Sequence, residues 1–304
     1  FLISLVFITL LLFLKNKLSF RVTFTLILFL VFFDLIDVSN RYLDRDLFLK
    51  PSRLSEFFNE NDADKKILKD TSYFRVFEPS STMQNARTSF FHNSVGGYHG
   101  AKPRRLEQFY KLFLKSKKTA LLDILNVKYV IEEKDGVSNA IENPNNLGLA
   151  WFTENLIFKN NPDSIYMDLL KFDLRKTAII EKNVRDSIIY SDEKRISQIN
   201  LLKNQPDEKT YSIKSNKTGF VVFSEMFYPG WKAKINDKKS EIYRVDFILR
   251  GLYIPKGDNI VKFYFEPNPI KYGSFVQIIS IIVLIGLIFI SLKNFFLVKN
   301  RITS

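Results

Sequence analysis

The densest group of side chains that could take part in chemistry lies in the run NARTSFFHNSVGGYHGAKPRR, residues 85–105. It holds both histidines of the chain, four cationic side chains and a tyrosine: Arg87, His92, Tyr98, His99, Lys102, Arg104 and Arg105. Aromatic faces beside cationic groups suit sugars and phosphates. We therefore predict that this loop binds a ligand of that kind. The alternative is a glycine-bent loop that packs on the core, with its histidines satisfied by backbone groups.

The residue types of the chain give little support for metal or redox chemistry. The chain has no cysteine, which excludes disulfides, thiolate catalysis and cysteine-based metal sites. Two histidines seven residues apart do not form a metal site without further ligands. Asp34 and Asp37 share one face of a predicted helix, but a lone carboxylate pair is more typical of a helix end. We predict no metal and no cofactor, and the residues alone identify no catalytic group.

A basic amphipathic helix is predicted directly after the loop, at residues 104–118. Its apolar face is formed by Leu106, Phe109, Tyr110, Phe113 and Leu114, and six basic residues occupy the rest. Such a helix can lie on an anionic membrane surface or grip a polyanion. The alternative is a helix packed against a sheet with its charges in water.

The stretch from Phe220 onward predicts an antiparallel, β-sandwich-like domain. Trp231, Ala233 and Ile235 alternate with lysines, as on a strand with one apolar face. Residues 220–223 and 247–249 are unbroken apolar runs, as expected for strands covered on both faces. Turn signals such as Tyr228-Pro229-Gly230 separate the strands. Trp231 is our candidate for an aromatic anchor that contacts a glycan or a partner.

Both ends of the chain are apolar enough for a membrane. Residues 275–292 carry no charge over 18 positions, which at about 1.5 Å per residue approaches the thickness of a bilayer core. Residues 20–36 form a second such stretch, and residues 1–14 a shorter one that we interpret as a helix cut by an incomplete N-terminus. Basic residues flank these stretches and predict their cytoplasmic ends. The middle of the chain is then extracytoplasmic, in a multi-pass protein of the plasma or inner membrane.

The predicted fold class is an α+β membrane protein, with transmembrane helices flanking an extracytoplasmic mixed α/β region. The predicted parts are two transmembrane helices at 1–37, an α+β lobe at 38–205, the β-domain at 206–270, and a C-terminal transmembrane helix with a cytoplasmic tail at 271–304. The polar region 185–209 is the expected boundary between the lobes. Strands are also expected at 73–77, 127–131, 149–158 and 177–181, and helices near Pro51 and at 163–170.

The formal net charge of +13 favours anionic partners such as lipid headgroups or phosphate-bearing polymers. An extracytoplasmic location argues against nucleic acid. The abundance of lysine, phenylalanine, isoleucine and asparagine could instead reflect the composition of an AT-rich genome.

Several runs together resemble the bacterial YfhO family of large multi-spanning membrane proteins. They are DLIDVSNRYL, YFRVF, SFFHNSVGGYHGAKPRR, LLDILNVKYVI, FYPGWKAKIND and FILRGLYIPKGDNIVKFYFEP. The resemblance implies a membrane glycosyltransferase that uses a polyprenyl-phosphate sugar and modifies a cell-envelope polymer. It places the presumed catalytic carboxylate in an early extracytoplasmic loop outside this sequence, so no catalytic residue is assigned. This part would bind acceptor or lipid phosphate, or act as scaffold.

A second hypothesis stands beside the first. The chain could be a non-catalytic, membrane-anchored envelope module that binds a glycan or a protein. Further membrane spans upstream, with an Asp or Glu after the first of them, would favour the enzyme, whereas a short anchor would favour the module.

Overall fold

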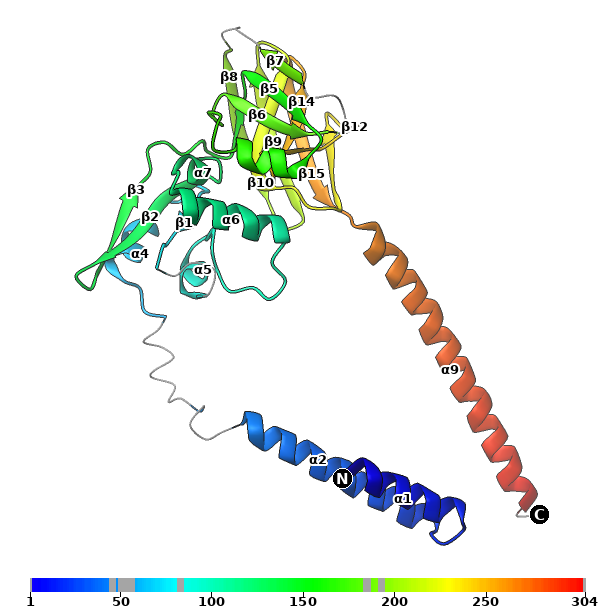
Figure 1. Ribbon diagram of the computed structural model, residues 1–304. Coiled ribbons are helices and arrows are strands. Elements are labelled where there is room, and N and C mark those ends of the chain that lie inside the picture. Colours follow the sequence, from blue (N-terminus) through cyan, green and yellow to red (C-terminus); the bar gives the residue numbers. More distant parts are fainter. Residues whose placement is uncertain are drawn as a thin grey trace. The chain divides into compact units, whose positions relative to one another are not determined.

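A computed structural model describes residues 2–43, 48, 58–80, 85–182, 187–190 and 195–302, without the side chains of 187–190 and 291–302. The chain divides into two units, Phe1–Asn59 and Glu60–Ser304. The first unit is a helical hairpin of α1 (Leu2–Leu14) and α2 (Phe20–Tyr42) (Figure 1). Ser19 caps α2 by accepting a hydrogen bond from the backbone N–H of Val22.

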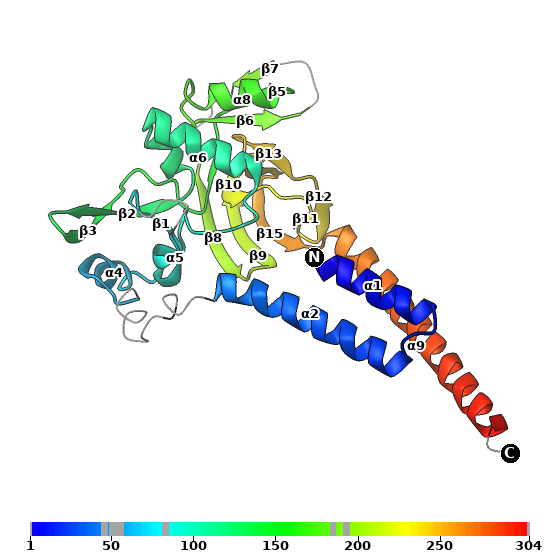
Figure 2. The ribbon, with the colours of Figure 1, turned by 60° about the horizontal axis from the view of Figure 1, so that its bottom comes forward.

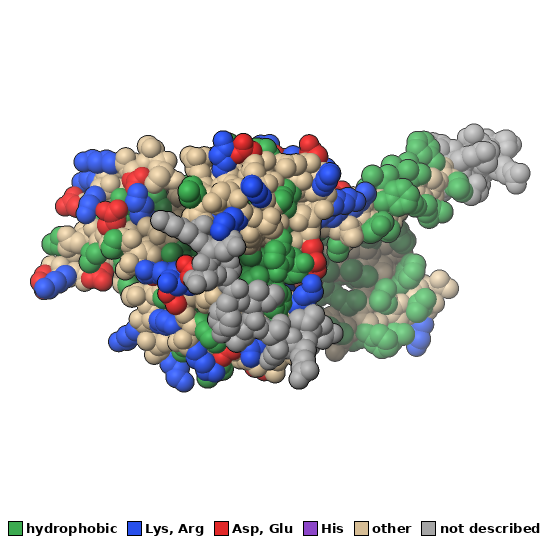
Figure 3. Space-filling model, turned by 90° about the horizontal axis from the view of Figure 1, so that it is seen from above, with side chains coloured by type: hydrophobic (Ala, Val, Ile, Leu, Met, Phe, Trp, Pro, Cys, Tyr) green, Lys and Arg blue, Asp and Glu red, His purple; other side chains and the backbone are tan. Residues whose placement is uncertain are grey.

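Two described helices are long and apolar enough to cross a membrane: α2, and the part of α9 (Asn268–Ile302) from Asn268 to Ile290. Their apolar side chains are almost entirely exposed, and Figure 3 shows hydrophobic side chains along the described part of α9. A soluble protein would bury such surfaces. The structure therefore agrees with the predicted apolar segments at residues 20–36 and 275–292, and it extends each of them into a longer helix.

The second unit is built on two large sheets that pack face to face. The seven-stranded sheet B has, in spatial order, β4 (Ala150–Phe152), β10 (Gly219–Met226), β14 (Leu249–Ile254), β13 (Tyr243–Val245), β6 (Thr177–Glu181), β5 (Asn155–Lys159) and β7 (Ser187–Tyr190). The antiparallel sheet C has the order β12 (Lys238–Ser240), β11 (Trp231–Ile235), β15 (Gly257–Phe265), β9 (Glu208–Ser215) and β8 (Ser197–Asn204). Sheet B is antiparallel except for the parallel pair β5 and β6.

The side-chain directions in strand β10 explain why residues 220–223 are all apolar. Val221 and Phe223 point between sheets B and C, where they meet Tyr211 and Phe263. Phe220 and Val222 point to the opposite face, into a core shared with helices. Both faces of this strand are buried, as predicted for residues 220–223.

Three helices contribute side chains to the core on that opposite face of sheet B: α6 (Arg104–Ser116), α7 (Ala120–Asp123) and α8 (Pro162–Asp168). Figure 2 shows α8 beside β5 and β6. Helix α6 buries Phe109, Tyr110 and Leu112, whereas Leu114 is about half exposed. Helix α6 therefore packs its apolar face on the protein, which is the second of the two interpretations of the basic amphipathic helix.

A smaller sheet A has its own core. Its strands are β1 (Arg75–Phe77), β2 (Val127–Lys134) and β3 (Val137–Glu142), with β1 and β2 parallel. Helix α4 (Asp62–Ile67) packs on it, while α5 (Arg87–Phe91) lies in the predicted ligand loop. The strands expected near residues 75 and 127 are thus present.

The structure differs from the sequence predictions in three places. Phe247 and Ile248 lie in a turn rather than a strand, because Asp246 and Phe247 take positive φ angles of 47° and 71°. The run 149–158 forms two strands, β4 and β5, not one. The boundary expected in region 185–209 falls within the paired strands β8 and β9, and sheet B takes strands from both sides of it. The helix expected near Pro51 lies outside the described residues.

Candidate functional site

Two residues of the predicted ligand loop, Arg87 and His92, converge on one buried carboxylate. Asp64 of α4 is fully buried; it accepts a hydrogen bond from Arg87 and lies 2.9 Å from Nε2 of His92. It also accepts a hydrogen bond from the N–H of Asn61. Burial acts to raise the pKa of Asp64, but these hydrogen bonds outweigh it and hold the pKa below its ordinary value. Arg87 and His92 therefore tie α5 and the loop to α4.

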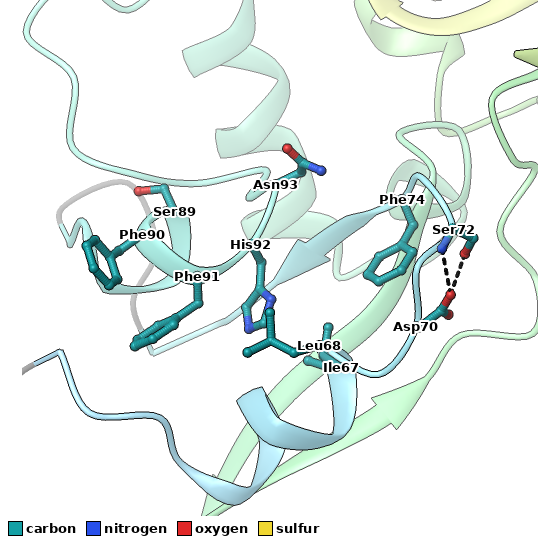
Figure 4. A pocket seen from close by; sticks show the side chains of 10 residues that line it. All are labelled: Ile67, Leu68, Asp70, Ser72, Phe74, Ser89, Phe90, Phe91, His92 and Asn93. Atoms are coloured by element: carbon teal, nitrogen blue, oxygen red, sulfur yellow. Dashed lines mark hydrogen bonds between the residues drawn. The ribbon is translucent and has the colours of Figure 1, made fainter. Parts of the chain in front are cut away.

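His92 also lines a pocket of about 310 Å³ with aromatic side chains of the loop (Figure 4). Phe90 and Phe91 lie on one side and Phe74 on the other. Asp70, at the pocket edge, is fully engaged, since it accepts hydrogen bonds from Ser72 and Lys128. The side chains of the loop thus help to enclose a pocket. The Asp70 carboxylate at the edge of this pocket already has hydrogen-bond partners within the protein.

Arg105 takes part in a second ion-pair group. It donates hydrogen bonds to Glu181 of β6, and its guanidinium lies 5.0 Å from the ring centre of Phe247. Arg244 of β13 bonds the same carboxylate at 3.2 Å. Burial acts to raise the pKa of Glu181, but the two arginines hold it below its ordinary value. Arg105 therefore fastens α6 to sheet B.

The other loop residues do not gather at one point. Tyr98, His99 and Arg104 are exposed, and Lys102 is half-buried. Lys118, at the end of the basic segment, donates to the carbonyl of Leu170 at 2.9 Å, beyond the end of α8. Several charges of the predicted anion-binding surface are thus used inside the molecule.

Two hollows surround Trp231, the candidate residue outside this loop. A hollow of about 570 Å³ lies between the Tyr228-Pro229-Gly230 turn and the first residues of α9, up to Ile270. A second, of about 440 Å³, is lined by Phe227, Tyr264 and the β12 region. Trp231, Lys232 and Glu266 line both. The half-buried indole of Trp231 is therefore shared by two adjoining hollows.

Gly230 explains the local shape. Its φ is 105°, and a Cβ atom there would lie 2.9 Å from both Phe265 and Pro267. The carbonyl of Gly230 also accepts a hydrogen bond from the N–H of Glu266 at 2.8 Å. The turn is thus fixed against the residues that lead into α9, and Trp231 is held where the candidate span begins.

The rim of these hollows is basic. Lys232 donates to Glu266 at 2.7 Å; this bond lowers the pKa of Glu266, and Lys271 and Lys239 lower it further. Three lysines thus surround one carboxylate, which leaves an excess of positive charge. Aromatic walls with a cationic rim suit a ligand that has both a sugar and an anionic group.

Sequence reasoning missed the residues behind Trp231. Arg250 of β14 is 1% exposed, and its guanidinium carbon lies 4.3 Å from the ring centres of both Trp231 and Phe263. It shares the carboxylate of Glu225 with cations from other strands. The sequence signal that could have identified Arg250 is its charge, which lies within the apolar run FILRGLYIP.

Comparison with known proteins supports the resemblance seen in the sequence. The chain is 24% identical over 127 residues, or 41% of its length, to the uncharacterized protein YfhO of Bacillus subtilis (strain 168). The matched region is 14% of the length of that relative. No family model matches the chain, and no solved structure matches it. This similarity is weak and covers less than half of the chain, and it supports the suspected relation to YfhO.

Proposed function

We propose that this chain is part of a membrane glycosyltransferase-like protein that transfers a sugar from a polyprenyl-phosphate donor to a cell-envelope polymer. In this proposal the second unit, Glu60–Ser304, which we call the strand-rich unit, binds the lipid-linked sugar or the acceptor at the membrane surface. The similarity to YfhO, two candidate membrane spans and the Trp231 hollows support it. The proposal assigns no catalytic residue to this chain.

The charge pattern supports an extracytoplasmic location for the strand-rich unit. Lys15 and Lys17 lie between α1 and α2, Arg21 lies in the first turn of α2, and Lys293 and Lys299 follow the apolar part of α9. If both groups face the cytoplasm, as the positive-inside rule predicts, α2 runs outward and α9 runs inward. Everything between the two helices then lies on the outer side.

One observation carries the proposal: the larger Trp231 hollow is built jointly by a sandwich turn and the first residues of α9. If α9 spans the bilayer, this hollow opens at the level of the lipid headgroups. Indole rings favour that level, and a basic rim attracts lipid phosphates. A sugar carried on a polyprenyl phosphate is presented at the same level.

The test uses the full-length protein in its host. Trp231→Ala should reduce the transfer of sugar to the envelope polymer while the amount of membrane-inserted protein is unchanged. Trp231→Phe should retain much of the transfer, because an aromatic wall remains. Trp151→Phe is the matched control, since Trp151 is buried in a core and lines neither hollow.

Two outcomes would count against the proposal. Normal sugar transfer by the Trp231→Ala variant would show that the Trp231 hollows are not needed for the function. Binding of the lipid-linked sugar by a full-length protein that transfers no sugar would favour the envelope-binding module instead.

A further inference from the structure

Arg250 is an unusual residue for the middle of a β-sandwich. It is 1% exposed, yet its Nε and Nη1 atoms have no hydrogen-bond partner within the described part of the protein. Burial lowers the pKa of this guanidinium, and the Glu225 carboxylate opposes that effect. Buried donors without acceptors are costly. An acceptor that Arg250 meets only in a ligand complex would remove that cost.

The charges around Arg250 do not cancel. Glu225 accepts a hydrogen bond from Arg75 at 3.1 Å, and its carboxylate lies 3.3 Å from Nζ of Lys209 and 3.8 Å from Nη2 of Arg250. Its side chain is 12% exposed. Arg75 has further acceptors in the carbonyls of Leu125 and Ser224. Three cations thus share one carboxylate, and Arg250, at the longest distance, is the least satisfied.

Trp231 separates Arg250 from the two hollows. One face of its ring lies over the guanidinium, while the residue lines both hollows. Trp231 is half-buried, and Lys232 lines both hollows with it. The indole is therefore the side chain that would have to move for Arg250 to reach the hollows.

We propose that Arg250 is the anchor of a phosphate-binding site and that the Trp231 side chain is its cover. This inference rests on the proposed function and adds the part of the ligand that is recognised, namely the phosphate that joins sugar and lipid. Guanidinium groups bind phosphate oxygens through charge-assisted hydrogen bonds. The lysines at the rim attract the anion, and Arg250 receives it once the indole turns aside.

The test begins with the full chain in detergent, in a Trp151→Phe background. Trp231 is then the only tryptophan, because the chain has two. Addition of inorganic phosphate should change the fluorescence of Trp231 in a saturable way, and chloride at equal ionic strength should not. Vesicles that carry polyprenyl phosphate should compete with inorganic phosphate if the source is a lipid. Failure to compete would limit the site to free phosphate.

Two variants separate the roles of anchor and cover. Arg250→Met keeps a long apolar side chain between the two rings and should weaken phosphate binding by about tenfold or more, the loss expected for charge-assisted hydrogen bonds. Trp231→Ala, followed by calorimetry, should bind inorganic phosphate more tightly because the cover is gone. Unchanged affinity in Arg250→Met would overturn the inference.

A second measurement covers the case in which Arg250→Met does not fold. A ligand that binds only the folded state raises its stability, so phosphate should raise the urea midpoint of the unaltered chain above that in chloride. Absence of both this rise and the Trp231 response would overturn the inference. The proposed function would survive that result, because sugar transfer is measured independently.

Discussion

Asp246 is a completely buried carboxyl group, and its replacement by asparagine should change how stability depends on pH. Its Oδ1 atom accepts a hydrogen bond from the N–H of Ile179 at 2.9 Å, whereas Oδ2 is buried without a partner among the described residues. Burial raises the pKa to about 8 from an ordinary value of 3.8, and the bond from Ile179 opposes this only in part. The folded protein therefore holds the carboxyl group in its neutral form at neutral pH.

The sign of the effect follows from proton binding. Between pH 4 and pH 8 the unfolded chain has released this proton and the folded chain has kept it, so stability falls as the pH rises. At roughly 1.4 kcal/mol for each pH unit in that window, the loss is on the order of 5 kcal/mol. An asparagine at this position would keep the carbonyl oxygen that faces Ile179 and would not titrate. Asp246→Asn should therefore have a much flatter stability profile across this window.

The assay is urea unfolding of the full chain in detergent at several pH values between 5 and 8. Both tryptophans lie in the strand-rich unit, so their fluorescence reports its unfolding and not that of α1 or α2. Asp258→Asn is the matched control, because Asp258 is exposed and pairs with an exposed lysine. Parallel pH profiles for the unaltered protein and Asp246→Asn would refute the reasoning.

Three further predictions use the same unfolding assay. Glu225→Gln should cost roughly 3 to 5 kcal/mol, because it leaves buried cations uncompensated; an unchanged midpoint would contradict this. Gly230→Ala should cost more than Gly257→Ala, since both glycines have φ near 105° but only the first would bring a Cβ against neighbours; equal costs would exclude the steric argument. Arg105→Ala should lower stability and Arg104→Ala should not, because only the first breaks a half-buried ion pair; the reverse order would contradict the structure.

Elements with local patterns could be predicted from the sequence. The alternation around Trp231 and the unbroken run at residues 220–223 report which strand faces are buried, and β11 and β10 form there. The absence of charge after Phe275 likewise predicts an exposed apolar helix. In each case successive residues along the chain have types that match their burial or exposure, so the local pattern predicts the element.

Contacts between distant residues could not be predicted in this way. Arg87 pairs with Asp64, 23 positions earlier, and Arg105 pairs with Glu181, 76 positions later. From the sequence alone these cations suggested ligand binding, because their carboxylate partners lie on other elements. The boundary expected near residue 205 failed for the same reason, since sheet B joins strands far apart in the chain.

The proposed function depends most on the location of Trp231 at the bilayer surface. This location can be measured with the Trp151→Phe variant reconstituted in vesicles of phospholipids brominated at defined acyl positions. We expect strong quenching of Trp231, greatest for bromines near the headgroups, and weak quenching of Trp151 in the matching Trp231→Phe variant. Trp231 fluorescence that is no more quenched than that of Trp151 would contradict this location.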